Sequence, residues 1–456
     1  MKSFRVPLTF VALLLALLAS ATQARDLLEV KPAAEGFSAE RLARIDGYME
    51  QAVKDGVMVG GQGLIARNGN IVYNEAWGDR DGEKNLPMEE DTIHRIYSMS
   101  KPITGVALMI LYEEGKFLLN EPVAKYLPEL ANLQVALSTA DGGVTAVSDG
   151  TQSSSSGEGD TAAVGKTRAP ARQPTIRDLM THTAGFTYGV FGDTEVDKLY
   201  RESRILQHPD LTDFVTKLGK IPLQYEPGTR WHYSVSVDVQ GALVERLAGM
   251  SFGKFLETRL FKPLGMEDTS FVVPKRKLKR LAQLYTQEGT PGEMGTAFRT
   301  RVNSSKLVPA PAGVSAGYME GATFEGGGGG LVSTTSDYLK FCQMMLNGGE
   351  LNGTRILSPN TVALMSRDHL GEIQMGFARA GVGFGLDFAV VEDAGLAGES
   401  GSDGEYNWGG AAGTRFWIDP KENVIGIFMV QSIPHRTTLA SHFKTLVYQA
   451  METSRD

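Results

Sequence analysis

The fold is decided by residues 96–115, which read IYSMSKPITGVALMILYEEG. Ser98 and Lys101 form an S-x-x-K pattern at the start of an apolar run that Gly115 ends, which predicts a helix over residues 98–114. Residues i and i+3 share one face of a helix, and a lysine buried beside a serine near the positive helix N-terminus can act as a base. The stretch therefore makes Ser98 a candidate nucleophile, with a helix-capping role as the alternative.

The S-x-x-K pattern occurs twice more, at Ser251–Lys254 and at Ser441–Lys444, so the pattern alone is weak. Ser251 stands where a helix begins, which predicts a cap. Ser441 falls inside a C-terminal helix that we expect to lie at the surface. Only Ser98 begins a mostly apolar helix after short strand-like segments, as a nucleophile in a cleft requires.

The composition excludes several classes of protein. The chain has 456 residues, of which 42% are hydrophobic and 21% charged, as in globular proteins. Its formal net charge of −8 argues against a nucleic-acid binder. The single cysteine, Cys342, excludes a disulfide framework and a cysteine-ligated metal, and its apolar helical context predicts a buried thiol. The seven histidines show no metal-binding spacing, so we expect neither a metal nor a cofactor.

Residues 1–24 predict a cleaved secretory signal. Lys2 and Arg5 precede an apolar run from Val6 to Leu18, and small residues lead to Ala24. The run is shorter than the roughly 20 residues that span a bilayer, and no later stretch approaches that length. We expect a mature chain of residues 25–456 in the periplasm, without stable membrane insertion; an uncleaved anchor is the alternative.

Elements at both ends of the chain predict the architecture. The Asn68-Gly69 pair is typical of a hairpin, and GTRFWIDP at 413–420 and NVIGIFMVQS at 423–432 read as two strands before a last helix. We expect an α+β unit whose antiparallel sheet comes from about 25–117 and 331–456, flanked by helices, with a mainly helical region at about 118–330. Residues 138–170 are rich in Ser, Gly, Thr and Ala, which predicts a flexible surface insertion; a lid is the alternative.

Two later segments carry further candidate site residues. Tyr233-Ser234-Val235 opens a helix, and a tyrosine there can shuttle a proton beside a lysine; a packed aromatic side chain is the alternative. Residues 406–413 read YNWGGAAG before a strand. Glycines let the backbone approach a substrate there, with N–H groups free to bind an oxyanion; a plain turn at a strand edge is the alternative.

Together the motifs IYSMSK, YSV and WGG resemble the serine β-lactamase/penicillin-binding superfamily, in its class C-like branch and closest to the family VIII carboxylesterases. TIRDLMTHTAGF at 175–186 and GGGGGLVSTTSDYLKF at 326–341 add to the likeness. The resemblance implies the β-lactamase/DD-peptidase-like fold and a serine acyl-transfer enzyme without metal or cofactor. Ser98 would attack the carbonyl, and Lys101 and Tyr233 would move its proton. The N–H groups of Ser98 and Ala411 would bind the oxyanion, and the other substrate-binding residues would be Trp408, Gly409 and Gly410.

The departures from the family pattern bear on the substrate. Val235 stands where β-lactamases carry Asn, and Trp408 replaces the Lys of their Lys-Thr-Gly motif. Loss of that cation should weaken the binding of anionic substrates, and the indole offers an apolar wall. We therefore expect a carboxylesterase acting on small or aromatic esters. The alternatives are β-lactamase, D-amino peptidase or transacylase activity on small amides or esters, and an inactive binding protein of the same fold.

A rival nucleophile lies in Gly313-Val314-Ser315-Ala316-Gly317, which matches the G-x-S-x-G elbow. His435 or His442, with Asp387 or Asp419, would complete its triad. The elbow needs a buried strand before the serine, and the preceding KLVPAPAG with its two prolines contradicts that context. We therefore favour Ser98. His182, in THTAG, is predicted to be a structural hydrogen-bonding residue.

Overall fold

The computed structural model describes residues 27–137, 166–207, 209–312, 318, 322–377 and 379–455. The predicted signal at 1–24, residues 138–165 of the predicted insertion, and Ser315 with its whole elbow motif lie outside the described residues.

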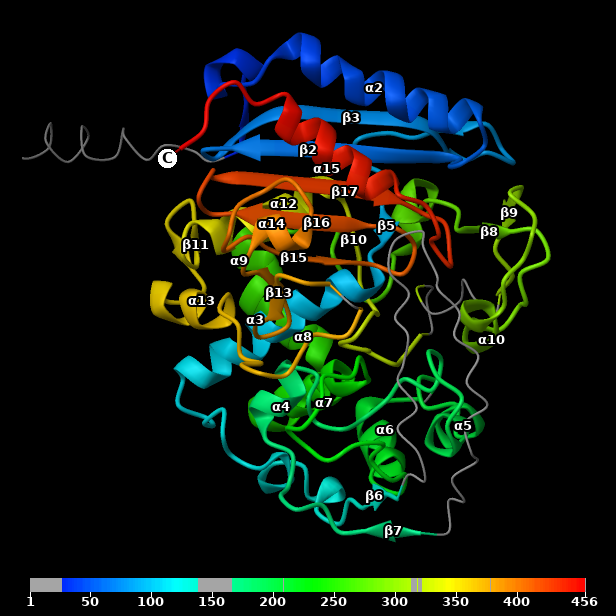
Figure 1. Ribbon diagram of the computed structural model, residues 1–456, viewed down its shortest axis with the longest axis vertical. Helices are drawn as coiled ribbons and strands as arrows, with labels where there is room; N and C mark the ends of the chain where they lie inside the picture. The colour runs from blue at the N-terminus through cyan, green and yellow to red at the C-terminus, as the bar shows by residue number, and fades with distance from the viewer. Residues whose placement is uncertain are drawn as a thin grey trace, which may run out of the picture.

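Strands from both ends of the chain form one central sheet in the order β1-β3-β2-β17-β16-β15-β14-β13, with β4 paired to β3 (Figure 1). The strands are β1 Leu28–Glu29, β2 Gly60–Arg67, β3 Asn70–Asp81, β4 Leu86–Pro87, β13 Val382–Phe384, β14 Ala389–Val391, β15 Tyr406–Gly409, β16 Arg415–Asp419 and β17 Val424–Val430. The neighbouring pairs are antiparallel except β1–β3, which is parallel. The predicted antiparallel sheet from both chain ends is thus confirmed, with one parallel pair at its edge.

The pairing of β17 with β2 joins the last part of the chain to the first hairpin, with Phe428 opposite Gly63. The hairpin turns at Asn68 and Gly69, whose φ angles of 55° and 81° suit the type I′ turn that the dipeptide predicts. Gly63 is needed in β2, since a Cβ there would lie 2.6 Å from the Phe443 ring. The glycine lets the last helix pack directly on the sheet.

Two helices cover one face of the sheet, α2 (Ala39–Lys54) and α15 (Leu439–Gln449), as Figure 1 shows. Ser38 caps α2 by accepting a hydrogen bond from the Arg41 N–H. Apolar side chains from both helices and from the sheet form a core beneath them, among them Leu42, Ile45, Met49, Trp417, Phe443 and Val447. The prediction that the Ser441–Lys444 helix is a surface helix is wrong at Lys444, whose side chain is buried against Glu405.

The other face of the sheet packs on α3 (Ser100–Glu113), α12 (Thr335–Leu346) and the helical region beyond them. That region and the remaining helices comprise α4 Ile176–Met180, α5 Glu195–Glu202, α6 Leu211–Leu218, α7 Ser236–Ala248, α8 Phe252–Leu256, α9 Lys262–Leu264, α10 Met294–Arg299, α13 Pro359–Met365 and α14 Ala394–Ala397. Tighter turns lie at η1 Pro32–Glu35, η2 Tyr97–Met99, η3 Val123–Lys125, η4 Pro128–Leu130 and η6 Lys275–Arg280, and η5 Glu257–Phe261 is π-helical. Figure 1 shows the helical region at the end of the molecule opposite α2.

Four short strand pairs complete the fold: β5 His94–Arg95 with β10 Val332–Ser333, β6 Val135–Ala136 with β7 Thr167–Arg168, β8 Tyr285–Gln287 with β9 Leu307–Pro309, and β11 Glu350–Leu351 with β12 Thr354–Arg355.

Ser251 caps α8, as predicted, by accepting a hydrogen bond from the Lys254 N–H. Cys342 in α12 is fully buried, as predicted, and burial raises the pKa of its thiol well above the usual range. Among the described residues, no helix combines the length and apolarity of a membrane span.

Candidate active site

Ser98 lies in η2, one turn before α3, on the wall of a cavity of about 580 Å³. The helix expected from residue 98 begins as this 3₁₀ turn and becomes α-helical at Ser100. Tyr97, immediately before Ser98, has a φ of 42°, which is strained for a bulky side chain. The strained turn directs the backbone so that Ser98 faces the cavity.

Lys101 is fully buried beneath Ser98. Its ammonium donates to Ser98 Oγ at 3.2 Å, to Tyr188 Oη at 3.0 Å and to the Gly328 carbonyl at 2.5 Å. No carboxylate in the described part of the chain lies within ion-pair distance of Lys101. The structure thus brings Ser98 and Lys101 together as the S-x-x-K spacing predicts, and neutral groups use all three ammonium protons.

Two buried carboxyl groups lie behind the lysine; sequence reasoning missed Asp238 and named Asp387 only as a partner of the rival serine. Asp238, on α7, accepts from the Gly328 N–H at 2.9 Å, and Asp387, in the turn between β13 and β14, accepts from the Gln240 amide at 3.0 Å. Burial raises the pKa of Asp238, and it raises the pKa of Asp387 well above its usual range, although the charge of Lys101 opposes both shifts. Lys101 is therefore surrounded by polar groups, and its partner Ser98 lines the cavity.

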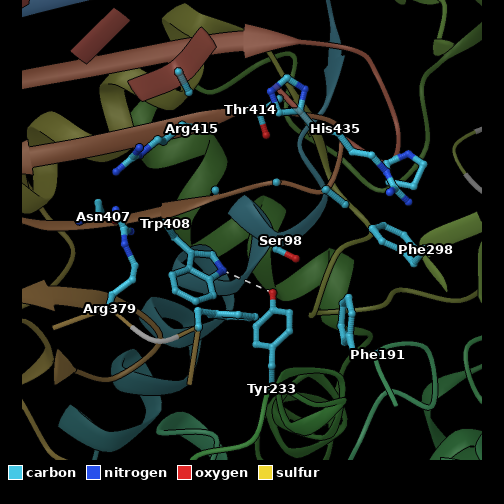
Figure 2. Close-up of a pocket in the computed structure, with 18 of the residues that line it drawn as sticks. Ser98, Phe191, Tyr233, Phe298, Arg379, Asn407, Trp408, Thr414, Arg415 and His435 are labelled. Carbon is cyan, nitrogen blue, oxygen red and sulfur yellow. Dashed lines mark hydrogen bonds between the residues drawn. The ribbon is translucent and has the colours of Figure 1, made fainter. Parts of the chain in front are cut away.

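Tyr233 lines the same cavity and lies beside Lys101, as its predicted role requires. Its hydroxyl accepts a hydrogen bond from Trp408 Nε1 at 3.4 Å, as the dashed line in Figure 2 shows, and Lys101 Nζ lies 4.6 Å from the centre of its ring. The tyrosine hydroxyl that accepts a hydrogen bond from Lys101 is that of Tyr188. Burial, followed by the nearby Asp238 carboxyl, raises the pKa of Tyr188 well above its usual range, so this phenol stays neutral.

The third predicted segment packs against the turn that carries Ser98, and Trp408, Gly409, Gly410 and Ala411 all line the cavity with the serine. A Cβ on Gly410 would lie 2.5 Å from the carbonyl oxygen of Ile96, two residues before the serine, so only glycine fits there. The Ala411 carbonyl accepts from the His435 N–H at 3.1 Å, while the Ala411 N–H has no acceptor among the described residues. This N–H group therefore suits a developing oxyanion.

The five-glycine run 326–330 packs between α3 and α7 and positions the carbonyl that holds Lys101. Thr104 Oγ1 donates to the Gly327 carbonyl at 2.9 Å, and a Cβ on Gly327 would lie 2.5 Å from the Val237 carbonyl oxygen. A Cβ on Gly328 would lie 2.6 Å from Tyr188 Oη. Close packing around the lysine therefore explains these glycines.

Aromatic and cationic side chains form the cavity walls. Figure 2 shows Phe191 and Phe298 on one side of Ser98, Tyr233 below it, and Arg379 and Arg415 on the other side. The Tyr233 and Phe191 rings lie 5.9 Å apart, and the Phe191 and Phe298 rings 5.7 Å apart. The wall nearest the serine is therefore apolar and continuous.

The described partners of the rival elbow do not assemble into a triad. Asp419 accepts from the Tyr448 hydroxyl at 2.8 Å, Asp387 sits behind Lys101, and His442 stacks on Tyr48 at 4.9 Å. His435 does line the cavity, where its Nε2 bonds Thr437.

His182 behaves as the predicted structural residue. It is buried against the Tyr233 ring, with Nδ1 3.4 Å from Ser234 Oγ, and burial lowers its pKa well below the usual value. Among the residues that the structure describes, no cluster of histidine, cysteine and carboxylate side chains could hold a metal ion.

In this α+β fold, a serine hydrogen-bonded to a buried lysine lines the same cavity as the Ala411 backbone. This arrangement defines the class of protein as a serine hydrolase. The family model described as Beta-lactamase matches residues 45–444, so the chain belongs to the Beta-lactamase family. The predicted resemblance is confirmed at this level.

Two relatives and one solved structure are similar to this chain over most of its length. Protein Rv1367c of Mycobacterium tuberculosis is 31% identical over 83% of this chain and 87% of its own, and Esterase EstB of Burkholderia gladioli is 30% identical over 84% and 88%. The solved structure of EstCE1, described as a hydrolase with promiscuous acyltransferase activity, has a TM-score of 0.70 and 25% identity, covering 91% of this chain and 99% of its own.

Proposed function

We propose that this chain is an exported carboxylesterase that hydrolyses small or aromatic esters through an acyl-enzyme on Ser98. The observation that carries the proposal is the 3.2 Å hydrogen bond between Lys101 Nζ and Ser98 Oγ at the floor of an aromatic-walled cavity. The name of the relative Esterase EstB supports ester hydrolysis. The intact Ser98–Lys101 pair argues against an inactive binding protein.

In the proposed acylation step, the Ser98 oxygen forms a bond to the ester carbonyl carbon and Lys101 accepts the serine proton. For Lys101 to accept it, the amine must first be neutral, with its two remaining N–H groups on Gly328 O and Tyr188 Oη. The negative charge moves to the carbonyl oxygen, where the N–H groups of Ser98 and Ala411 would stabilise it by roughly 3–4 kcal/mol per donor.

The tetrahedral intermediate then collapses and the bond to the leaving oxygen breaks. We assign the proton delivery to Tyr233, because this residue lines the cavity beside Lys101, whereas Tyr188 is not among the residues that line it. Lys101 returns the proton to Tyr233 and restores the neutral amine. Water, activated by the same pair, attacks the acyl carbon and releases the acid and free Ser98.

The side chains lining the cavity support an ester with apolar groups near the scissile bond. Trp408 stands 5.6 Å from the Tyr233 ring and 5.3 Å from the Phe384 ring, so the indole is fixed as an apolar wall. The second candidate is acyl transfer to an alcohol or amine, which the likeness to EstCE1 and its promiscuous acyltransferase activity supports. The acceptor would then replace water in the second step.

The deciding experiment replaces the two candidate nucleophiles separately and measures kcat/KM on p-nitrophenyl butyrate. Ser98→Ala should lose more than about a thousandfold, since the covalent route disappears, while Ser315→Ala should stay active. A fluorophosphonate probe should label the wild type on Ser98. A fully active Ser98→Ala enzyme would overturn the proposal.

A substrate panel then separates the proposed activities. Assays with p-nitrophenyl esters, a chromogenic cephalosporin and a D-alanyl peptide should show the highest kcat/KM on esters. A much higher kcat/KM on the cephalosporin would make the chain a β-lactamase.

Export is proposed from the sequence of residues 1–24, whose charged start, apolar run and small residues before Arg25 are typical of a cleaved signal. N-terminal sequencing of the protein from a periplasmic extract should begin at Arg25. Recovery of the intact N-terminus in the cytosol would contradict it.

A further inference from the structure

The cavity beside Ser98 is rich in positive charge although the chain has a net charge of −8. Its lining contains one carboxylate, Glu399, and four guanidinium groups, those of Arg301, Arg379, Arg415 and Arg436. A cleft lined by one sign of charge concentrates ligands of the opposite sign. The cavity therefore differs in charge from the molecule that contains it.

Two of these arginines share a single carboxylate. Arg379 and Arg415 both bond Glu399, the latter at 2.8 Å. Burial opposes ionisation of Glu399, but Arg415, Arg379 and Lys444 outweigh it and lower its pKa to about 2. This end of the cavity therefore holds a permanent carboxylate between its cations.

The other two arginines lack such a partner. Arg436, which follows β17, donates to the backbone carbonyl of Thr300 at 2.9 Å, and Arg301 is the next residue. Neither guanidinium forms an ion pair with a carboxylate among the described residues. Burial and the charge of Arg301 lower the pKa of Arg436, as expected of two adjacent cations without a counter-ion. Arg299, two residues earlier, is by contrast paired with Asp193 at 3.0 Å.

The unpaired arginines lie where a substrate can reach them from Ser98. Phe298, two residues before Thr300, ends the aromatic wall that runs from Tyr233 through Phe191. On the other side, the N–H of His435, next to Arg436, bonds the carbonyl of Ala411. A substrate held at Ser98 can thus extend along the wall toward Arg301 and Arg436.

We propose that Arg301 and Arg436 form a subsite for an anionic group, so that the preferred substrates are esters carrying a carboxylate or a similar anion at the end remote from the scissile bond. A guanidinium group can donate two parallel hydrogen bonds to the oxygens of a carboxylate, and the second cation nearby adds to the attraction. This subsite would supply the positive charge that Trp408 removes from the third motif. The inference rests on the proposed esterase activity of Ser98.

The test compares each anionic ester with its neutral methyl ester, so that the ratio of the two kcat/KM values reports the anion alone. One arm places the anion on the acyl group, with p-nitrophenyl hydrogen adipate against p-nitrophenyl methyl adipate. The other places it on the leaving group, with 4-acetoxybenzoate against methyl 4-acetoxybenzoate, following release of the phenol. Spontaneous hydrolysis is subtracted in both arms.

In at least one arm, Arg436→Gln and Arg301→Gln should each lower the anionic-to-neutral ratio by about fivefold or more, and Arg436→Lys should retain most of it. The arm that responds identifies the side of the ester that carries the anion. Arg299→Gln, the matched control outside the cavity lining, should leave both ratios unchanged. An increase from about 50 to about 500 mM NaCl should lower the wild-type ratio and change the ratio of the double Gln variant much less.

Ratios that are unchanged in both arms for both Gln variants would overturn the subsite, as would an equal effect of Arg299→Gln, which would indicate only the general field of the molecule. The proposed esterase activity fails in a different way, through Ser98→Ala retaining hydrolysis of the neutral esters. The two failures are therefore distinguishable in one set of assays.

Discussion

Around Lys101, two tyrosines of the same chemistry have different surroundings. Tyr188 Oη accepts from Lys101 Nζ inside the protein, 3.0 Å away, and burial keeps its phenol neutral. Tyr233 presents its hydroxyl to the cavity and to Trp408. In the proposed mechanism the first holds the lysine, and the second exchanges a proton with a bound substrate.

Replacing each tyrosine by phenylalanine should separate these roles. Tyr233→Phe should lower kcat by about a hundredfold or more, as expected for loss of a proton-transfer group. Tyr188→Phe removes one hydrogen bond to a charged group and should lower kcat by about tenfold. Steady-state kcat and KM on a neutral ester measure both. A loss in Tyr188→Phe as large as in Tyr233→Phe would transfer the proton-delivery role to Tyr188.

At the residue scale, the sequence predicts those contacts of the site that depend only on local helix geometry. Ser98 and Lys101 meet because three residues of helix place them on one face. The hydrogen bond between Lys101 and Tyr188 and the position of Asp387 near the lysine could not be predicted, because both residues come from distant loops whose paths depend on packing. Asp387 has a φ of 66°, a conformation that no nearby sequence pattern indicates. The contact between Tyr233 and Trp408 could not be predicted for the same reason.

At the scale of elements, the last helix docks on the sheet through buried charges as well as apolar side chains. Lys444 on α15 contacts Glu405 at 2.8 Å and Glu399 at 3.4 Å, and Arg415 on β16 contacts Glu399 from the sheet. The apolar pattern predicted the helix, but it could not predict this network, because a lysine in an amphipathic pattern usually lies in solvent.

The network makes stability depend on pH. Its cations lower the pKa of Glu399 from the usual 4.5 to about 2, so the stabilisation is complete above about pH 4.5 and is lost as pH falls toward 2. Glu399→Gln should therefore lower the free energy of unfolding by about 1–3 kcal/mol at about pH 7, with the difference shrinking below about pH 4. Urea unfolding at neutral, mildly acidic and strongly acidic pH measures it.

The control for this measurement is Glu350→Gln, which removes the exposed pair with Arg355 and should cost less than about 0.5 kcal/mol. A Glu399→Gln difference that stays constant from neutral to strongly acidic pH would show that the lost stability has another origin.

The glycine run offers an element-scale test of how Lys101 is positioned. In Gly327→Ala, the new methyl group would lie 2.5 Å from the Val237 carbonyl, so the segment must shift and carry the Gly328 carbonyl away from Lys101. We expect kcat to fall at least about tenfold and Tm to fall by several degrees.

Gly329→Ala is the matched substitution, because its Cβ would meet nothing closer than 3.6 Å. It should behave like the wild type in both assays. Equal effects of the two substitutions would mean that the run acts through chain flexibility rather than through close packing.

At the scale of the whole molecule, the two ends of the chain build one half and the middle of the chain builds the other. The Ser38 N–H donates to the Ala450 carbonyl at 2.9 Å, and β17 lies beside β2, so the first and last elements close a common layer. Both halves contribute to the site: Ser98 and Trp408 come from the segments around the sheet, Tyr188 and Tyr233 from the helical region. This architecture was predictable because strand patterns occur at both ends and the apolar helices lie between them.

The short strands β6 and β7 flank residues 138–165 of the predicted insertion and pair with each other. β6 and β7 pair Ala136 with Thr167, and the Leu137 N–H donates to the Lys166 carbonyl at 3.0 Å, so residues 137 and 166 already stand at the end of a hairpin ladder. Replacing residues 138–165 by Asn-Gly should close this ladder with a type I′ turn. A shorter loop also costs less closure entropy, which should raise the free energy of unfolding by about 1–2 kcal/mol. Thermal unfolding and kcat/KM on a neutral ester test it.

A stable variant with unchanged kcat/KM would make the segment a surface insertion. A stable variant with a tenfold lower kcat/KM would show that the segment contributes to the cavity, as the lid alternative requires.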